Sequence, residues 1–255
     1  MLLHRPRRRT QQLIPLALLA VVLGSSSCGG SRFWAPDPVT REGDKILRLW
    51  QGSTIAAICV GALVWGLLGY VVFKYRRRND DVPRQNPYNV PVEVVYTVAP
   101  LVVVAVLFAF TVGTQQEVVS TSARPDLVVD VNGFQWQWQF HYPKEDITVT
   151  GTPGEPPTLV LPVGQTVTFR LKTSDVIHSF WVPRFLSKRD LIPGVDNEVQ
   201  VEVKEPGTWV GRCAEFCGLD HYKMNFSVRA VPVDEFSRWV AEQRSGAAAG
   251  VGGAG

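Results

Sequence analysis

The stretch Cys213-Ala-Glu-Phe-Cys217-Gly-Leu-Asp-His221-Tyr-Lys-Met224 places two cysteines, a histidine and a methionine within twelve residues. Thiolate and thioether sulfur atoms favour copper, and imidazole binds copper or zinc. Residues with the composition of β-strands lie on both sides of the stretch. The sequence therefore predicts a tight metal-binding loop between two strands.

Three interpretations of this loop are open. A disulfide between Cys213 and Cys217 leaves His221 and Met224 without a role. A zinc site with both thiolates, His221 and a distant histidine forms a legitimate tetrahedral set, but it does not need the methionine. A pair of copper ions uses every member, because two thiolates can bridge the ions, each ion takes one imidazole, and the thioether binds weakly.

Copper needs a second histidine, and the chain has four histidines in all. His4 belongs to the N-terminal leader, and His141 follows an aromatic strand. His178 lies among strand-like residues in Asp175-Val-Ile-His-Ser-Phe-Trp181 and is the best candidate. A lone histidine among apolar residues is usually part of a core, but the metal loop makes a ligand role the better prediction.

The spacing C-x3-C-x3-H-x2-M, with D-V-x-H-S-F upstream, resembles cytochrome c oxidase subunit II. This resemblance implies a cupredoxin-like β-barrel that holds a mixed-valence dinuclear copper centre, called CuA. It implies copper ligands at His178, Cys213, Cys217, His221, Met224 and the backbone carbonyl of Glu215. It also implies that the side chain of Glu215 binds a magnesium or manganese ion shared with subunit I.

The resemblance also implies a reaction and partners. Subunit II accepts electrons from cytochrome c, or from a c-type cytochrome of a bc complex, and passes them to haem a in subunit I. Haem a3 and CuB in subunit I then reduce oxygen to water while protons are pumped. Two alternatives are the copper-free docking subunit of a quinol oxidase, which should lack the cysteines, and nitrous oxide reductase, which needs an additional His-rich domain.

The N-terminal residues have the pattern of a secretory signal peptide. Residues 1–27 have a basic start, an apolar run and small residues before Cys28. These small residues also suggest lipidation of Cys28, although Ser25 stands where a leucine is usual. Residues 28–52 are predicted to form a segment on the outer face.

Residues 53–73 and 93–114 are apolar and long enough to cross a hydrocarbon core of ~30 Å as helices. The basic run Lys74-Tyr-Arg-Arg-Arg78 places the loop 74–92 on the cytoplasmic side. The two spans are therefore predicted to form a hairpin in the lipid of the plasma membrane, with both of its ends on the outer face.

Glu93 stands at the inner end of the second span, where a carboxylate is costly. Taken alone, it is best explained as a solvated interfacial charge. The segment Glu93-Val-Val-Tyr-Thr-Val-Ala-Pro100 resembles the family pattern E-x-x-W-T-x-x-P, with Tyr96 in place of the common tryptophan. In that family the glutamate marks the entrance of a proton channel.

Short strand-like runs separated by Pro and Gly follow the second span. We predict strands at 127–131, 135–142, 147–150, 158–161, 166–172, 176–182, 198–203, 208–211 and 225–231. The fold class is thus a membrane-anchored all-β protein with an antiparallel sandwich or barrel over 118–243, which the resemblance implies to be the cupredoxin domain. Asp234 is predicted to cap a short terminal helix, and residues 244–255 to form a disordered tail.

Aromatic residues alternate with glutamines in Gly133-Phe-Gln-Trp136-Gln-Trp138-Gln-Phe140, which predicts one strand with four aromatic side chains on one face. The run resembles the family segment G-x-Q-W-x-W, whose first tryptophan, here Trp136, admits electrons from cytochrome c. Arg189-Asp-Leu-Ile-Pro-Gly194 resembles a loop near the subunit I surface, where Val195 replaces a common arginine.

The formal net charge of +3 is misleading, because the leader contributes four arginines and no acid. Residues 114–245 carry 13 basic and 17 acidic side chains. This balance argues against a nucleic-acid partner, whose phosphates require a basic surface. It suits a basic protein partner.

Overall fold

A computed structural model describes residues 32–82, 84–122, 124–152 and 154–251. The chain divides into a unit that ends at Asp37 and a unit that begins at Pro38. In the first unit, the described residues form a turn in which Ala35 N donates to Arg32 O over 3.0 Å. The expected signal peptide and Cys28 lie outside the described residues.

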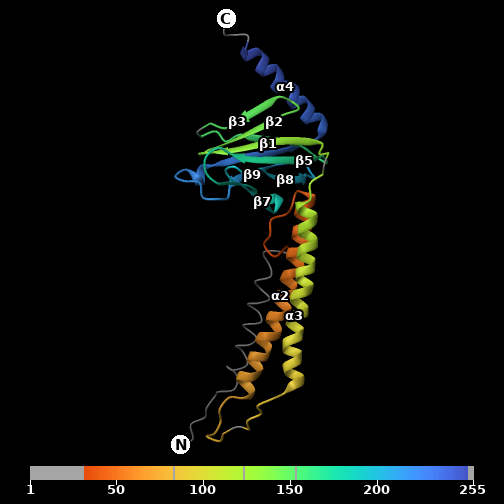
Figure 1. Cartoon of the computed structure of the whole chain (residues 1–255), viewed down its shortest axis with the longest axis vertical. Coiled ribbons are helices and arrows are strands. Elements are labelled where there is room, and N and C mark those ends of the chain that lie inside the picture. Colours follow the sequence, from red (N-terminus) through yellow and green to blue (C-terminus); the bar gives the residue numbers. More distant parts are fainter. Residues whose placement is uncertain (1–31, 83, 123, 153, 252–255) are drawn as a thin grey trace, which may run out of the picture. The chain divides into compact units, whose positions relative to one another are not determined.

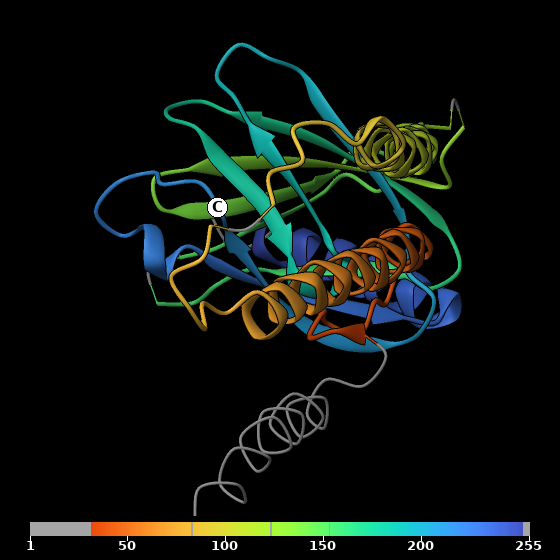
Figure 2. The same ribbon diagram turned by 90° about the horizontal axis from the view of Figure 1, so that it is seen from below.

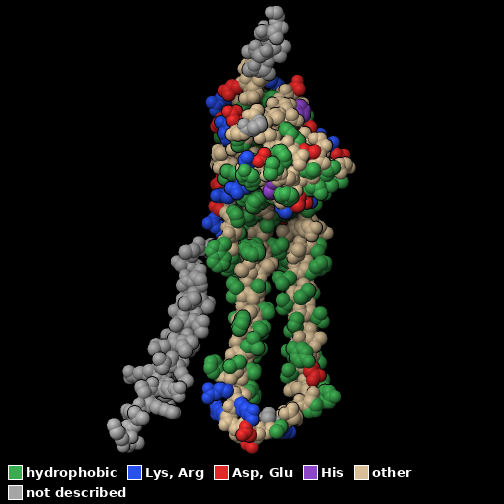
Figure 3. Space-filling model, turned by 90° about the vertical axis from the view of Figure 1, so that its left-hand side faces the viewer, with side chains coloured by type: hydrophobic (Ala, Val, Ile, Leu, Met, Phe, Trp, Pro, Cys, Tyr) green, Lys and Arg blue, Asp and Glu red, His purple; other side chains and the backbone are tan. Residues whose placement is uncertain are grey.

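Two long helices begin the second unit, α2 (Arg41–Lys74) and α3 (Val90–Val119) (Figure 1). Thr40 caps α2 by accepting a hydrogen bond from Gly43 N over 3.0 Å. Asn89 caps α3, and a proline follows in its first turn. Both helices are long and apolar enough to cross a membrane, and hydrophobic side chains dominate their surfaces (Figure 3).

Helix α2 begins twelve residues before the predicted span, at Arg41. Its first turn is bound to the end of strand β8 (Asn197–Glu202) by a hydrogen bond and an ion pair. Glu42 accepts a hydrogen bond from Glu202 N over 3.0 Å, and Arg41 pairs with the Glu202 carboxylate at 2.9 Å. At ~1.5 Å per residue, the 34 residues of α2 span ~50 Å, which exceeds the hydrocarbon core. The segment predicted as 28–52 therefore ends inside this helix.

Among the described residues, ten strands form two five-stranded sheets, with the orders β3-β2-β1-β5-β8 and β4-β10-β9-β6-β7. The strands lie together at one end of the two helices (Figures 1 and 2). The remaining strands are β1 (Leu127–Phe134), β2 (Gln137–Tyr142), β3 (Ile147–Thr150), β4 (Thr158–Pro162), β5 (Thr166–Thr173), β6 (His178–Val182), β7 (Ser187–Leu191), β9 (Gly207–Cys213) and β10 (Asn225–Val231). Aromatic rings fill the core. Phe226 lies 5.2 Å from Trp138, 5.4 Å from Phe140 and 5.0 Å from Phe180, measured between ring centroids.

The predicted antiparallel pairing holds for most strand pairs but not for all of them. Strands β1 and β5 pair in parallel, as do β4 and β10. The chain changes sheets between β3 and β4 and again between β4 and β5. Strands that are distant in sequence thereby become neighbours, and such connections allow parallel pairing. The prediction of two helices followed by an all-β domain is confirmed.

Three local predictions differ from the structure. The expected strand 135–142 begins only at Gln137, because residues 135 and 136 form a turn between β1 and β2. Strand β7 was not predicted, since its sequence Ser-Lys-Arg-Asp-Leu is mostly charged, as suits the edge of a sheet.

The third difference is at the C-terminus, where helix α4 (Val233–Val251) runs through residues that were expected to be disordered. Alanine, the strongest helix former, is frequent in that stretch. Asp234 lies in the first turn of the helix, where an acid is favourable. Trp239 fastens α4 to the domain, with its ring 5.1 Å from that of Tyr142.

Candidate metal centre

The loop between β9 and β10 carries the predicted ligands. Cys213 is the last residue of β9, and Met224 comes directly before β10. A hydrogen bond of 3.0 Å from Cys213 N to Met224 O closes the base of the loop. The loop contains one short 3-10 helix, η4 (His221–Lys223), so the predicted loop between two strands is confirmed.

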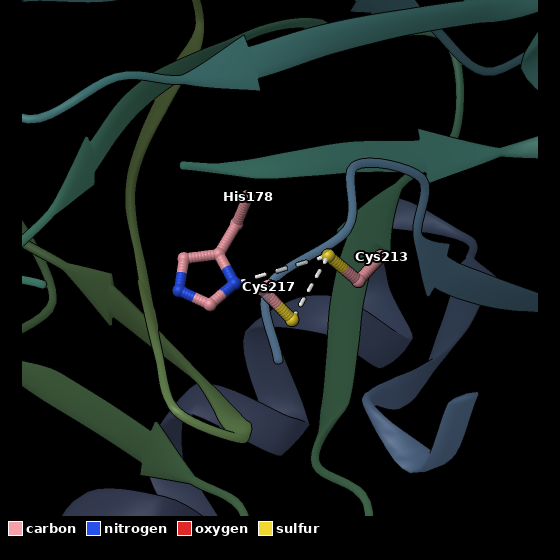
Figure 4. A group of neighbouring side chains, drawn as sticks. All are labelled: His178, Cys213 and Cys217. Atoms are coloured by element: carbon pink, nitrogen blue, oxygen red, sulfur yellow. Dashed lines mark hydrogen bonds between the residues drawn. The ribbon is translucent and has the colours of Figure 1, made fainter. Parts of the chain in front are cut away.

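The structure brings His178, Cys213 and Cys217 together (Figure 4). His178 Nδ1 lies 3.8 Å from Cys213 Sγ, and Cys213 Sγ lies 3.8 Å from Cys217 Sγ. All three residues are buried, and the side chain of His178 has no exposed surface. His178 comes from β6, which pairs with β9 in the same sheet. The sheet thereby joins a histidine to a cysteine that lies 35 residues later.

The remaining predicted ligands surround the same two sulfur atoms. His221 Nδ1 lies 3.5 Å from Cys217 Sγ, and Met224 Sδ lies 3.8 Å from it. The carbonyl oxygen of Glu215 lies 3.2 Å from Cys213 Sγ. Met224 is buried, whereas His221 is partly exposed. The six donors therefore form one continuous cluster.

These donors fit a metal centre with bridging thiolates. Metal–thiolate bonds of ~2.3 Å allow one ion to touch two sulfur atoms that are up to about 4.6 Å apart. The Cys213 and Cys217 sulfur atoms are 3.8 Å apart, and both cysteines are free, so the disulfide interpretation does not hold. A set of two thiolates, two imidazoles and a thioether suits copper better than zinc.

The two thiols differ in acidity. Burial alone raises the pKa of the Cys213 thiol. Hydrogen bonds with His178 and with backbone groups lower it by more than burial raises it, so that the pKa is about 7. Burial and the negative charge of Cys213 raise the pKa of Cys217 to about 12. Cys213 is therefore the thiol that loses its proton first, close to neutral pH. A metal held by Cys213 and Cys217 would stabilise both of them as thiolates.

Trp136 lies in the β1–β2 turn and not on the aromatic face of a strand. Phe134 ends β1, so of the four aromatic residues only Trp138 and Phe140 share the buried face of β2. The prediction of four aromatic side chains on one face of a single strand was therefore wrong. The half-buried Trp136 donates from Nε1 to Cys217 O over 3.2 Å. The turn thus places this indole against the metal loop.

Two residues at the site had no predicted role. Asp175 accepts a hydrogen bond from His178 Nε2 over 2.9 Å, and Gln135 donates from Nε2 to Cys217 O over 2.8 Å. Asp175 belongs to the quoted segment D-V-x-H-S-F, which was the only signal in the sequence. Its contact with a turn 40 residues away follows from the tertiary structure alone.

Other candidate residues lie elsewhere. His141 is hydrogen-bonded to Thr148 Oγ1 over 3.0 Å on β2, away from the cluster, and His4 lies outside the described residues. Glu93 lies in the first turn of α3, where its Oε1 accepts a hydrogen bond from Asn89 N over 3.0 Å. Cys59 is exposed on α2.

Two family models match most of the chain. The family described as "Cytochrome C oxidase subunit II, periplasmic domain" matches residues 156–231, and its "transmembrane domain" matches residues 37–112. The crystallised periplasmic domain of subunit II of cytochrome oxidase from Bradyrhizobium japonicum is 30% identical. That comparison covers 49% of this chain and 98% of the other, with a TM-score of 0.46.

Full-length relatives are also similar. The probable cytochrome c oxidase subunit 2 of Streptomyces coelicolor is 39% identical over 92% of this chain and 87% of its own length. Cytochrome c oxidase subunit 2 of Mycobacterium bovis is 34% identical over 94% of this chain and 84% of its own. With its two membrane helices, outer-facing cupredoxin-like domain and cluster of copper-type ligands, the chain belongs to the cytochrome c oxidase subunit II family.

Proposed function

We propose that this subunit holds a dinuclear copper centre and uses it to pass electrons from a c-type cytochrome to haem a of subunit I. Haem a3 and CuB of subunit I then reduce oxygen. The observation that carries the proposal is the continuous set of donors from His178 through Cys213 and Cys217 to His221, with neighbouring donor atoms 3.5–3.8 Å apart. The remaining ligands are Met224 and the Glu215 carbonyl.

The chain's own residues provide a rigid and largely dry site for this transfer. Cys213, Cys217, His178 and His221 would hold the copper, which would supply one-electron redox chemistry when bound. Cys213 and His178 are held by paired strands, and Met224 is buried beneath the loop. Because these side chains cannot move far, the reorganisation that accompanies electron transfer should be small.

The surface around Trp136 is the proposed place where the donor cytochrome docks. A groove of about 910 Å³ beside Trp136 is lined by residues that include Gln135, Pro156 and Tyr222. The net acidic charge of residues 114–245 would steer a basic cytochrome, so association should slow as salt increases.

The exposed tip of the copper loop is proposed to contact subunit I. Phe216 is 77% exposed and Leu219 is 81% exposed, and such apolar surface commonly marks a protein interface.

Among the described residues, the Glu215 carboxylate has no hydrogen-bond or ion-pair partner and is free to bind magnesium or manganese. Glu215→Gln should lower bound manganese and leave the copper spectrum intact. An unchanged manganese content would reject this role.

We place the hairpin in the plasma membrane, with the loop that follows Lys74 inside the cell. A basic cluster lies at this end of the hairpin (Figure 3), as the positive-inside rule requires. Lipidation of Cys28 would add a second anchor to the outer leaflet.

We propose that Glu93 gathers protons at the inner end of α3 for a channel in subunit I. Its hydrogen bond to Asn89 N also gives it a capping role. Glu93→Gln keeps an acceptor for the cap but removes the acid, so it should slow oxygen consumption per assembled complex while preserving the copper spectrum. Unchanged turnover in this variant would leave only the capping role.

The central test is a copper count on the purified oxidase, with electron paramagnetic resonance to detect a delocalised copper pair. We expect this subunit to contain two copper ions. The Cys217→Ser variant should lose the paramagnetic resonance signal of the delocalised pair. Ser122→Ala provides a control far from the loop in sequence and should leave the signal unchanged. One copper, or zinc in its place, would reject the proposal.

A further inference from the structure

The turn formed by Gln135 and Trp136 is held from both sides of the metal cluster. On one side, Gln135 N donates to Asp175 Oδ2 over 2.7 Å. On the other side, Gln135 Nε2 and Trp136 Nε1 both donate to the carbonyl oxygen of Cys217, over 2.8 Å and 3.2 Å. The turn is therefore hydrogen-bonded to a copper-loop cysteine and to the carboxylate that contacts His178.

Gly218 permits this close approach. A Cβ atom on Gly218 would lie 3.1 Å from Gln135 Nε2 and 3.3 Å from the Trp136 indole, and the backbone φ of +116° is one that other residues rarely adopt. The loop and the turn are thus built to touch at this point. The contact depends on the backbone of the loop as well as on the side chains of the turn.

Asp175 uses a different oxygen for Gln135 and for His178. Its Oδ2 binds Gln135 N, and its Oδ1 lies 2.9 Å from His178 Nε2. A carboxylate only accepts hydrogen bonds, so His178 carries a proton on Nε2, and its Nδ1, 3.8 Å from Cys213 Sγ, is the nitrogen left for a metal. The side chain of Asp175 is 29% exposed, and Val176 N and Thr173 Oγ1 also donate to its Oδ1, over 2.6 Å and 3.1 Å.

We propose that Asp175 is a positioning residue that holds the copper ligand His178 and the electron-accepting turn in register with each other. Its carboxylate selects the tautomer and ring orientation of His178 and, through Gln135 N, fixes the turn that carries Trp136. The inference rests on the proposed copper site and assigns a role to a residue outside the ligand set. The competing role for Asp175 is that of a surface acid that only attracts a basic donor.

The two roles differ in how they respond to charge and to shape. Asp175→Glu keeps the charge but lengthens the side chain by one methylene, so a purely electrostatic role predicts native behaviour. Asp175→Asn keeps one oxygen, but its NH2 group must face either Gln135 N or His178 Nε2, so one of these two hydrogen bonds is lost. The positioning role predicts that both variants perturb the site.

The experiment uses the purified oxidase complex with the native subunit, Asp175→Asn, Asp175→Glu and the control Glu155→Gln. Glu155 is an exposed acid on the turn next to the groove beside Trp136, so Glu155→Gln removes one charge from the same surface without touching the cluster. The measurements are copper content, paramagnetic resonance spectrum, reduction potential and the rate of electron uptake from a rapidly mixed c-type cytochrome at several salt concentrations.

Mutation of a residue that orients a metal-bound histidine typically lowers metal affinity or activity about 10–100-fold. We expect Asp175→Asn to slow electron uptake by at least about 10-fold at every salt concentration and to alter the spectrum, with Asp175→Glu intermediate. Glu155→Gln should change only the salt dependence. If Asp175→Glu matches the native complex and Asp175→Asn matches Glu155→Gln, the positioning role is overturned.

A measurement on the copper-free chain tests the inference independently of copper. Amide hydrogen exchange of the peptide that contains Gln135 should be faster in Asp175→Asn than in the native chain, because its N–H loses a charged acceptor. Unchanged exchange would overturn the link to the turn even if no variant loads copper. Absence of copper in the native complex would instead reject the proposed function.

Discussion

The outer domain and the helical hairpin use the same kinds of apolar residue in opposite ways. In the domain, Phe140 and Phe226 are buried almost completely between the sheets, whereas Phe108 and Phe110 on α3 are 68% and 66% exposed. Helix α3 has no buried residue at all within the described chain. The domain therefore encloses its own core, while the hairpin leaves its apolar surface for lipid or other subunits.

The largest expected contrast comes from removing one phenylalanine ring in each region. Phe226→Ala deletes the ring that contacts Trp138, Phe140 and Phe180, and should lower the free energy of unfolding of the domain by about 3–5 kcal/mol. Phe108→Ala is the matched control and should change it by less than about 0.5 kcal/mol. Denaturant unfolding of the full chain in detergent, followed by tryptophan fluorescence, measures both. Equal effects would break the comparison.

Two glycines provide a second contrast with the same chemical change. A Cβ atom on Gly211 in β9 would overlap the ring of Phe226, so Gly211→Ala should cost about 1–3 kcal/mol of domain stability. Gly61 in α2 has open space around its Cβ position, and Gly61→Ala should stabilise the helix by up to about 1 kcal/mol. Thermal unfolding by circular dichroism reports both signs. A destabilising Gly61→Ala would mean that the hairpin surface is already packed.

The smallest effect is expected where the two regions meet. Lys204 pairs with Asp44 on α2 at 2.7 Å, with both side chains about one-third exposed. Such pairs contribute about 0.2–1 kcal/mol. A double-mutant cycle with Lys204→Ala and Asp44→Ala should give a coupling energy in this range that falls as salt increases. Zero coupling would show that hydrogen bonds, such as that between Glu202 N and Glu42, hold the junction without help from this pair.

Much of the fold and the site could be predicted because the signals are local. The apolar spans, the strand-like runs and the spacing of Cys213, Cys217, His221 and Met224 all lie within short windows. The predictions failed where distant strands decide the outcome. The turn at Gln135 and Trp136, the charged strand β7 and the parallel pairs depend on neighbours that are far away in sequence.

The sequence alone determined the chemistry of the loop and the membrane spans, because residue type and spacing set both the donor atoms and the length of an apolar helix. Only the tertiary structure decided how His178 meets Cys213, how Trp136 touches Cys217, and how Asp175 joins the two. These contacts arise from strand pairing and sheet packing. Their geometry depends on residues up to 81 positions apart, which no local pattern records.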